Sequence, residues 1–276
     1  MLKNSPWFRP EQYLDIELLQ SADEGKDVRD LEQRVKTIMA MEDENPEKSS
    51  LAAGVYNEIA ELPVAKGYKY IEPSDLQGIR NQRAGDSPVL HGQITEGEHL
   101  YNKIYGAWLG RCAGCLLGKP IEGWHRDSIT GLLRDTGNYP FKYYISSEIP
   151  DEINLRYDVE DKKSGTKKCW INNVRHMPED DDTNYTIIGL KIFEKYGSGF
   201  TPDDVAECWL SSLPILHVCT AERVAYKNLV NSILPPDSAS FRNAYREWIG
   251  AQIRADFFDF FVKTGVPQYK SQFYYL

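Results

Sequence analysis

Contiguous carboxylates directly before a helical pattern are the clearest chemical signal in this sequence. The stretch "PEDDDTNYT" at residues 178–186 places Glu179, Asp180, Asp181 and Asp182 side by side. Neighbouring anions repel each other, and a hard divalent cation relieves that repulsion by accepting their oxygens as ligands. The stretch therefore predicts a metal site. Because its ligands are oxygens, Mg²⁺ or Mn²⁺ is favoured over zinc.

A helix N-cap is the alternative explanation for these acids, since carboxylates are stabilised at the positive end of a helix. The segment "TPDDVAECW" at 201–209 offers an internal comparison. There Thr201 as cap, Pro202 in the first helical position and two acids in the first turn need no further explanation. The stretch at 178–186 has one acid more than capping uses, so both interpretations stay open.

A second chemical signal ends the segment "GAWLGRCAGCLLGKPIEGW". Glu122 lies on a stiff Pro-Ile-Glu-Gly turn, where a carboxylate can orient a ligand or a water molecule. Before it, glycines recur every fourth residue and form one helix stripe that predicts the close approach of another helix: Gly106, Gly110, Gly114 and Gly118. Cys112 and Cys115 have no second pair for a zinc site, so we interpret both as small buried residues.

A third signal lies in "NAYREWIGAQIRADFF", which otherwise has the composition of a core helix. Gly250 and Ala251 permit close backbone approach. Arg254 is a cation within an aromatic setting and could bind a phosphate.

The elements that carry these residues are predicted to be helices, and the class is mainly α because no run of alternating strands appears. Residues 11–62 have helical periodicity, whereas 63–95 read as irregular and contain the best domain boundary. Residues 138–178 form a long polar stretch of the kind that is functional or disordered. Further helices are expected at about 183–196, 202–212, 220–233 and 243–264.

Composition excludes several classes of protein. The net charge of −9 argues against a nucleic-acid backbone as partner. No apolar run approaches the roughly 20 residues of a membrane-spanning helix, and the N-terminus has no apolar leader core. Five cysteines in 276 residues fit a reducing compartment. We therefore expect a cytoplasmic protein with no membrane partner.

Taken in order, the three motifs resemble those of the ADP-ribosylglycohydrolase family. The likeness covers roughly residues 100–258, and the first hundred residues resemble an extension seen in a bacterial branch. It implies an all-α fold around two Mg²⁺ or Mn²⁺ ions in an ADP-ribose cleft. It also implies an ADP-ribosylated substrate, or a small molecule like ADP-ribose, as partner.

The resemblance also implies roles for individual residues. Asp181, Asp182 and Thr183 match a Ser/Thr-Asp-Asp-Thr metal motif, and Asp180 stands where the Ser/Thr would be. Glu122 matches the glutamate that approaches the metals and the scissile ribose. A further match, to the segment that lines the substrate cleft, covers Gly250, Ala251 and Arg254.

One departure from the family is the second acidic motif, of Gly-Asp-Thr-Asp type, which this sequence lacks. We therefore expect two parts: a helical extension and linker at 1–95, and a C-terminally truncated family domain at 96–276. Truncation would impair activity. It would also expose the apolar segment 257–262, through which the chain would self-associate.

The predicted function is metal-dependent hydrolysis that removes ADP-ribose from a modified substrate through an N- or O-glycosidic bond. Glu122 would be catalytic, and Asp180, Asp181 and Asp182 would bind metal. A non-catalytic module that binds ADP-ribose is the alternative, and hydrolysis of an ADP-ribosylated substrate would separate the two. A Mg²⁺-dependent isoprenoid synthase ranks last, because no second acid-rich motif with the required spacing follows.

Overall fold

The protein is all-α, as the sequence predicts, and no strand occurs among the residues that the structure describes. This computed structural model describes residues 7–83, 85, 97–159 and 169–262, and for 258–262 the backbone alone. It has two compact units, one made of 1–92 with 185–276 and the other of 93–184. None of the described helices is long and apolar enough to cross a membrane.

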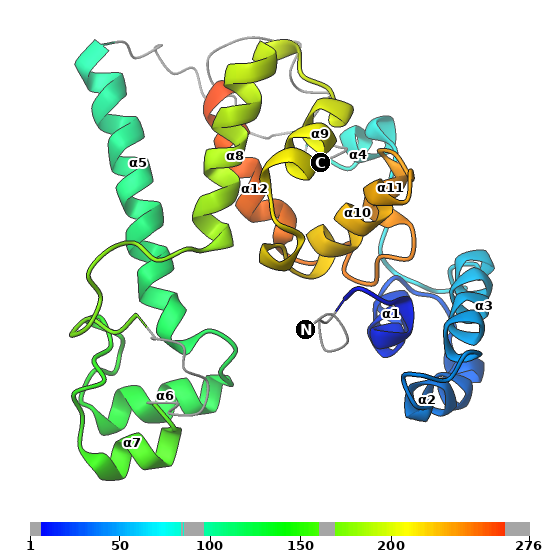
Figure 1. Cartoon of the computed structure of the whole chain (residues 1–276), viewed down its shortest axis with the longest axis horizontal. Coiled ribbons are helices and arrows are strands. Elements are labelled where there is room, and N and C mark those ends of the chain that lie inside the picture. Colours follow the sequence, from blue (N-terminus) through cyan, green and yellow to red (C-terminus); the bar gives the residue numbers. More distant parts are fainter. Residues whose placement is uncertain (1–6, 84, 86–96, 160–168, 263–276) are drawn as a thin grey trace. The chain divides into compact units, whose positions relative to one another are not determined.

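The first unit contains most of the helices (Figure 1). Its N-terminal segment forms α1 (Leu14–Asp23), α2 (Glu32–Ala40), α3 (Lys48–Glu61) and α4 (Leu76–Asn81). Its second segment forms most of α8 (Asp181–Tyr196), then α9 (Pro202–Ser212), α10 (Thr220–Val230), α11 (Asp237–Ser240) and α12 (Gly250–Val262). The second unit contains α5 (Gly97–Gly118), α6 (Arg126–Asp135), α7 (Asp151–Tyr157) and the start of α8.

The N-terminal helices share a hydrophobic core with a segment far along the chain. Tyr13 and Val55 are almost fully buried, and they belong to the same cluster as Val224 of α10 and Tyr245. The Tyr13 and Tyr245 rings lie 5.6 Å apart between centroids. Helices α1, α2 and α3 therefore bury their apolar faces against part of the segment assigned above to the family domain, and a domain boundary at residue 95 stays a prediction.

Charged groups reinforce that packing. Arg246 donates to both carboxylate oxygens of Glu17, at 3.0 and 2.9 Å, and to both of Glu24, at 2.7 and 2.6 Å. The Glu17 side chain is only 5% exposed. Burial raises the pKa of Glu17, although the charge and hydrogen bonds of Arg246 act in the opposite direction. Arg246 therefore compensates a carboxylate that is otherwise costly to bury.

A second core in the same unit joins α8, α9 and α12. Tyr185, Ile192 and Trp209 pack there with Phe257, which is 8% exposed. Gly189 makes room for Phe257, whose ring would lie 2.7 Å from a Cβ at that position. The predicted exposure of the segment 257–262 is therefore wrong at Phe257. The other side chains of that segment lie outside the described residues.

The second unit has a small core of its own, made by α6, α7 and three loop residues. Leu132, Leu133, Ile145, Val159 and Trp170 are all buried there. Helix α7 lies inside the polar stretch 138–178, for which no helix was predicted. Among the described loop residues, the Asn172 side chain accepts from the Ser147 backbone N–H at 2.9 Å and joins the chain before α7 to the chain after it.

The glycine stripe on α5 meets no other helix among the residues that the structure describes. A Cβ built at Gly106, Gly110, Gly114 or Gly118 would meet nothing within 4 Å among the described residues. The described residues therefore do not show the predicted close approach, which stays a prediction. By contrast, a Cβ at Gly131 of α6 would overlap the Tyr157 hydroxyl of α7.

We expect Arg246→Ala to lower the free energy of unfolding by roughly 3–5 kcal/mol, because it leaves the buried Glu17 carboxylate unpaired. Arg156→Ala is the control, since Arg156 forms an ion pair with Asp135 while 59% exposed. That loss should stay within about 1 kcal/mol. Urea denaturation followed by circular dichroism measures both, and equal losses would contradict the assigned role of Arg246.

Two helical glycines of the second unit should respond to alanine with opposite signs. Gly114→Ala should stabilise the protein by up to about 1 kcal/mol, because alanine is the better helix former and the position is open. Gly131→Ala should destabilise it by roughly 1–3 kcal/mol, because the methyl group meets Tyr157. Urea denaturation curves test both, and a loss of stability in Gly114→Ala would show that the stripe is a packing surface.

Candidate functional site

The two strongest chemical signals of the sequence meet in the second unit. Helix α5 runs into a short 3₁₀ turn, Lys119–Ile121, whose Pro120 is buried. Glu122 follows with its backbone N–H donating to the Lys119 carbonyl at 3.4 Å, and Gly123 then adopts a left-handed backbone with φ +78°. The turn is therefore held by the buried Pro120 and by this hydrogen bond, and it presents Glu122 as an exposed side chain.

Asp180 caps the helix that carries the other acids. Its Oδ1 accepts from the Asp182 backbone N–H at 3.0 Å. Its carbonyl accepts from the Thr183 and Asn184 N–H groups at 3.2 and 2.9 Å. The capping interpretation thus explains Asp180, whereas Asp181 and Asp182 add two further carboxylates in the first turn of α8.

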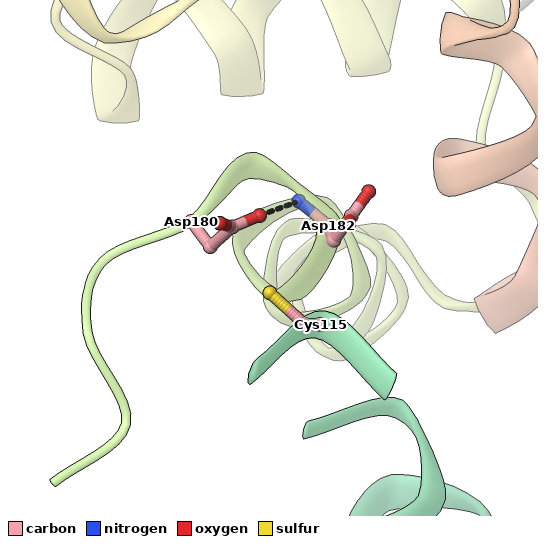
Figure 2. Close-up of side chains that lie close together, drawn as sticks. All are labelled: Cys115, Asp180 and Asp182. Carbon is pink, nitrogen blue, oxygen red and sulfur yellow. Dashed lines mark hydrogen bonds between the residues drawn. The ribbon is translucent and has the colours of Figure 1, made fainter. Parts of the chain in front are cut away.

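Carboxylates from α8 meet a thiol from α5 (Figure 2). One oxygen each of Asp180 and Asp182 and the Cys115 sulfur lie within 4.8 Å of one another. Those three atoms could hold a metal ion, since carboxylates and thiols are both metal ligands. Asp181, the third predicted ligand, is not part of this three-atom group.

Two cations of the same segment also contact the acids. The Lys119 ammonium lies 2.5 Å from Asp180 Oδ2, and the Asp180 side chain is 8% exposed. Arg111 donates to the Asp182 carbonyl at 2.7 Å. The charge of one carboxylate, that of Asp180, is therefore compensated by a lysine within the site.

The three aspartates have pKa values that are shifted in different directions. Burial raises the pKa of Asp181 to about 6, and the charges of Asp180, Asp182 and Glu122 act in the same direction. Burial and the charge of Asp180 also raise the pKa of Asp182, against the effects of Arg111 and Lys119. Glu122 is therefore close enough to Asp181 for its charge to act on that carboxyl group.

Asp180 behaves in the opposite way. Burial alone would raise its pKa, but the hydrogen bonds from Lys119 and the Asp182 N–H, with the Lys119 charge, leave it lowered. One acid of the row is thus held ionised by a neighbour, while the next resists ionisation. A divalent cation would favour the ionised form of both.

Cys115 was missed by the sequence analysis, which treated it with Cys112 as a small buried residue. It is half-buried, and burial raises its pKa to about 12, with Asp180 and Asp182 adding to the effect. It is therefore a neutral thiol at physiological pH rather than a nucleophile. A signal did exist: Arg111, Cys115 and Lys119 follow at intervals of four, which places them along one helix face.

The third predicted group lies in the other unit. Gly250 begins α12, and a Cβ there would overlap the Glu222 carboxylate. Arg254, one turn later, forms an ion pair with that carboxylate, and the Glu222 side chain is 4% exposed. The structure thus gives the glycine and the arginine a role in fixing α12 to α10, while a role of Gly250, Ala251 and Arg254 in substrate binding stays a prediction.

Comparison with known proteins gives one match. A family model described as ADP-ribosylglycohydrolase matches residues 96–268. The matched range covers both the turn at Glu122 and the acids at 180–182, and it extends beyond residue 258, where the likeness was expected to end. No curated protein and no solved structure matched the sequence.

The raised pKa of Asp181 predicts a pH-dependent stability. An aspartate with an ordinary pKa of 3.8 and a folded-state pKa of about 6 binds its proton more tightly in the folded state. Its contribution to stability is therefore lost as the pH rises from about 4 to about 6. In the presence of a chelator, Asp181→Asn should melt at a higher temperature than wild type at pH 7.5, and at a similar temperature at pH 4.

The control is Asp203→Asn, which removes an exposed first-turn acid of α9. It should lower stability slightly at pH 7.5, because it removes only a favourable interaction with the helix dipole. Added Mg²⁺ or Mn²⁺ should raise the wild-type melting temperature and leave that of Asp181→Asn unchanged. Identical behaviour of the two variants would exclude a special environment at Asp181.

Proposed function

The chain belongs to the ADP-ribosylglycohydrolase family, and from this membership we propose that it is a metal-dependent hydrolase that removes ADP-ribose from a modified substrate. The family consists of hydrolases that act on ADP-ribose linkages, and it is generally dependent on divalent metals. The observation that carries the proposal is the junction of the Glu122 turn with the acids of α8 in one unit. Two motifs separated by more than fifty residues supply one acidic site there.

The proposed metal ligands are Asp180, Asp181 and Asp182, and the ion is Mg²⁺ or Mn²⁺. The donor set fits a divalent cation, because burial, followed by the neighbouring carboxylates, raises the pKa of Asp181, and a bound cation would favour its ionised form. When bound, the ion would polarise the glycosidic bond and hold the ribose hydroxyls. The Cys115 sulfur lies beside Asp180 and Asp182, but a neutral thiol is a poor ligand for these hard cations, so it is left out of the proposed ligand set.

Glu122 is the proposed catalytic residue. Its carboxylate is exposed on a fixed turn, so it can accept a proton from a water molecule and orient that water toward the anomeric carbon. The buried Pro120 and the hydrogen bond from the Trp124 N–H to the Ile121 carbonyl, at 3.1 Å, limit the movement of the turn. A general base held in this way acts with little loss of conformational entropy.

A non-catalytic ADP-ribose-binding module is the second candidate, and the Lys119 contact favours it. The Lys119 ammonium is hydrogen-bonded to Asp180 at 2.5 Å and supplies positive charge where a metal would. An ADP-ribose pyrophosphate could pair with Lys119 or Arg111, since both are cations beside the acids. Binding of ADP-ribose without hydrolysis would then be the outcome.

Release of ADP-ribose from an ADP-ribosylated protein, with Mg²⁺ or Mn²⁺ present, separates the two candidates. We expect metal-dependent release by wild type and a loss of about 10²–10⁴-fold in kcat for Glu122→Gln. Asp181→Asn should require a higher metal concentration, and the control Asp203→Asn should behave as wild type. Binding of ADP-ribose with no release by wild type would favour the binding module over the hydrolase.

A further inference from the structure

A cleft of about 640 Å³ lies in the first unit, away from any residue assigned above to binding or catalysis. Helices α1 and α3 line it together with the chain around α11. Its volume falls within the roughly 300–1,000 Å³ that small-molecule sites occupy. Ile59, Ala60, Ile233 and Phe241 give it an apolar surface, and charged side chains line the remainder.

Most charged groups of the cleft are already compensated. Glu17 and Glu24 share Arg246, which donates to both carboxylates. Lys26 donates to the Ile59 carbonyl at 2.8 Å. Four of the charged side chains that line the cleft therefore already have hydrogen-bond partners within the protein.

Arg242 differs from the others in three respects. Its Nε is buried and has no hydrogen-bond partner among the described residues, although buried donors are nearly always paired. Its Nη2 donates to the neutral Asn57 amide at 3.0 Å. Its backbone is left-handed, with φ +47°, a conformation that is strained for an arginine and that concentrates at ligand-binding positions.

The guanidinium is also held in place by a ring. It lies 5.1 Å from the centroid of the Phe241 ring, which is 43% exposed. A guanidinium fixed by an aromatic face and an amide retains donors in one plane, which suits the two oxygens of a carboxylate. The cleft therefore combines an oriented cation with an exposed apolar surface.

We propose that this cleft binds a small organic monocarboxylate with an apolar body, whose carboxylate pairs with Arg242 and whose body rests on Phe241 and Ile233. A phosphate would carry more negative charge into a cleft that Glu17, Glu24 and Asp237 also line. Repulsion from those carboxylates disfavours it relative to a monoanion. The proposal is independent of the hydrolase activity, because it uses none of the residues at Glu122 or on α8.

Benzoate is the probe, and the chain of 276 residues is titrated by isothermal calorimetry. Benzamide, which has the same ring without the charge, and inorganic phosphate are titrated in parallel. We expect saturable binding of benzoate, with benzamide and phosphate each weaker by about tenfold or more. Absence of benzoate binding at millimolar concentration, or equal binding of benzoate and benzamide, would overturn the proposal.

Variants then assign the binding to Arg242. Arg242→Asn keeps a residue that tolerates the left-handed backbone and removes the guanidinium. It should weaken benzoate binding at least about tenfold, and Arg242→Lys should weaken it less, because the charge remains. The control Arg156→Asn, an exposed arginine of the other unit, should bind as wild type.

Unchanged affinity in Arg242→Asn, with a far-ultraviolet spectrum like that of wild type, would overturn the assignment. Should that variant fail to fold, the comparison of benzoate with benzamide on wild type still decides the chemical class of ligand. Loss of benzoate binding in the control as well would mean that the probe binds elsewhere, and it would also reject the cleft.

Discussion

Pairing of buried carboxylates with cations from distant parts of the chain is the constraint on which much of this structure depends. Glu17 of α1 pairs with Arg246, Glu222 of α10 with Arg254, and Asp180 with Lys119. Each carboxylate side chain is 8% exposed or less. An unpaired charge at that depth costs several kcal/mol, so each pair specifies which elements must lie together.

These pairs also explain sequence features that look functional in isolation. Gly250 leaves space at the start of α12 for the Glu222 carboxylate, and Arg254 completes the pair one turn later. Glycine and arginine at this spacing are therefore required for packing, whatever else they contact. Conversely, the repeated glycines of α5 look structural in the sequence, yet the described residues leave them open.

The sequence predicts the fold class and most helix positions, because apolar periodicity reports directly on the buried face of each helix. The expected helix at 202–212 agrees with α9, which has the expected Thr201 cap. Helix α12 begins at Gly250 rather than near residue 243, because the chain before it packs as turns around the buried Asn243. Helix α7 was missed, since its apolar residues are few and pack only against α6 and nearby loops.

The acidic residues of the candidate site could be predicted from the sequence, but the residues that contact them could not. Three contiguous aspartates conflict with simple capping, and this conflict is visible in one short stretch of sequence. The partners of those aspartates are Cys115, Lys119 and Arg111, which lie on another helix more than sixty residues earlier. Their spacing of four shows that they share a face, but no local pattern shows which residues that face meets.

Lys119 links the structural constraint to the proposed chemistry. Its ammonium satisfies Asp180 in the same way that Arg246 satisfies Glu17, so Asp180 is stable without a metal. Asp181 has no equivalent compensation in its electrostatics: burial, Asp180, Asp182 and Glu122 all raise its pKa. A divalent cation would therefore gain most from Asp181 and least from Asp180, because the gain depends on the repulsion relieved. Asp180 and Asp181 therefore have different roles. Asp180 fixes the start of α8 against the turn that carries Glu122, and Asp181 carries the negative charge that a metal ion would neutralise.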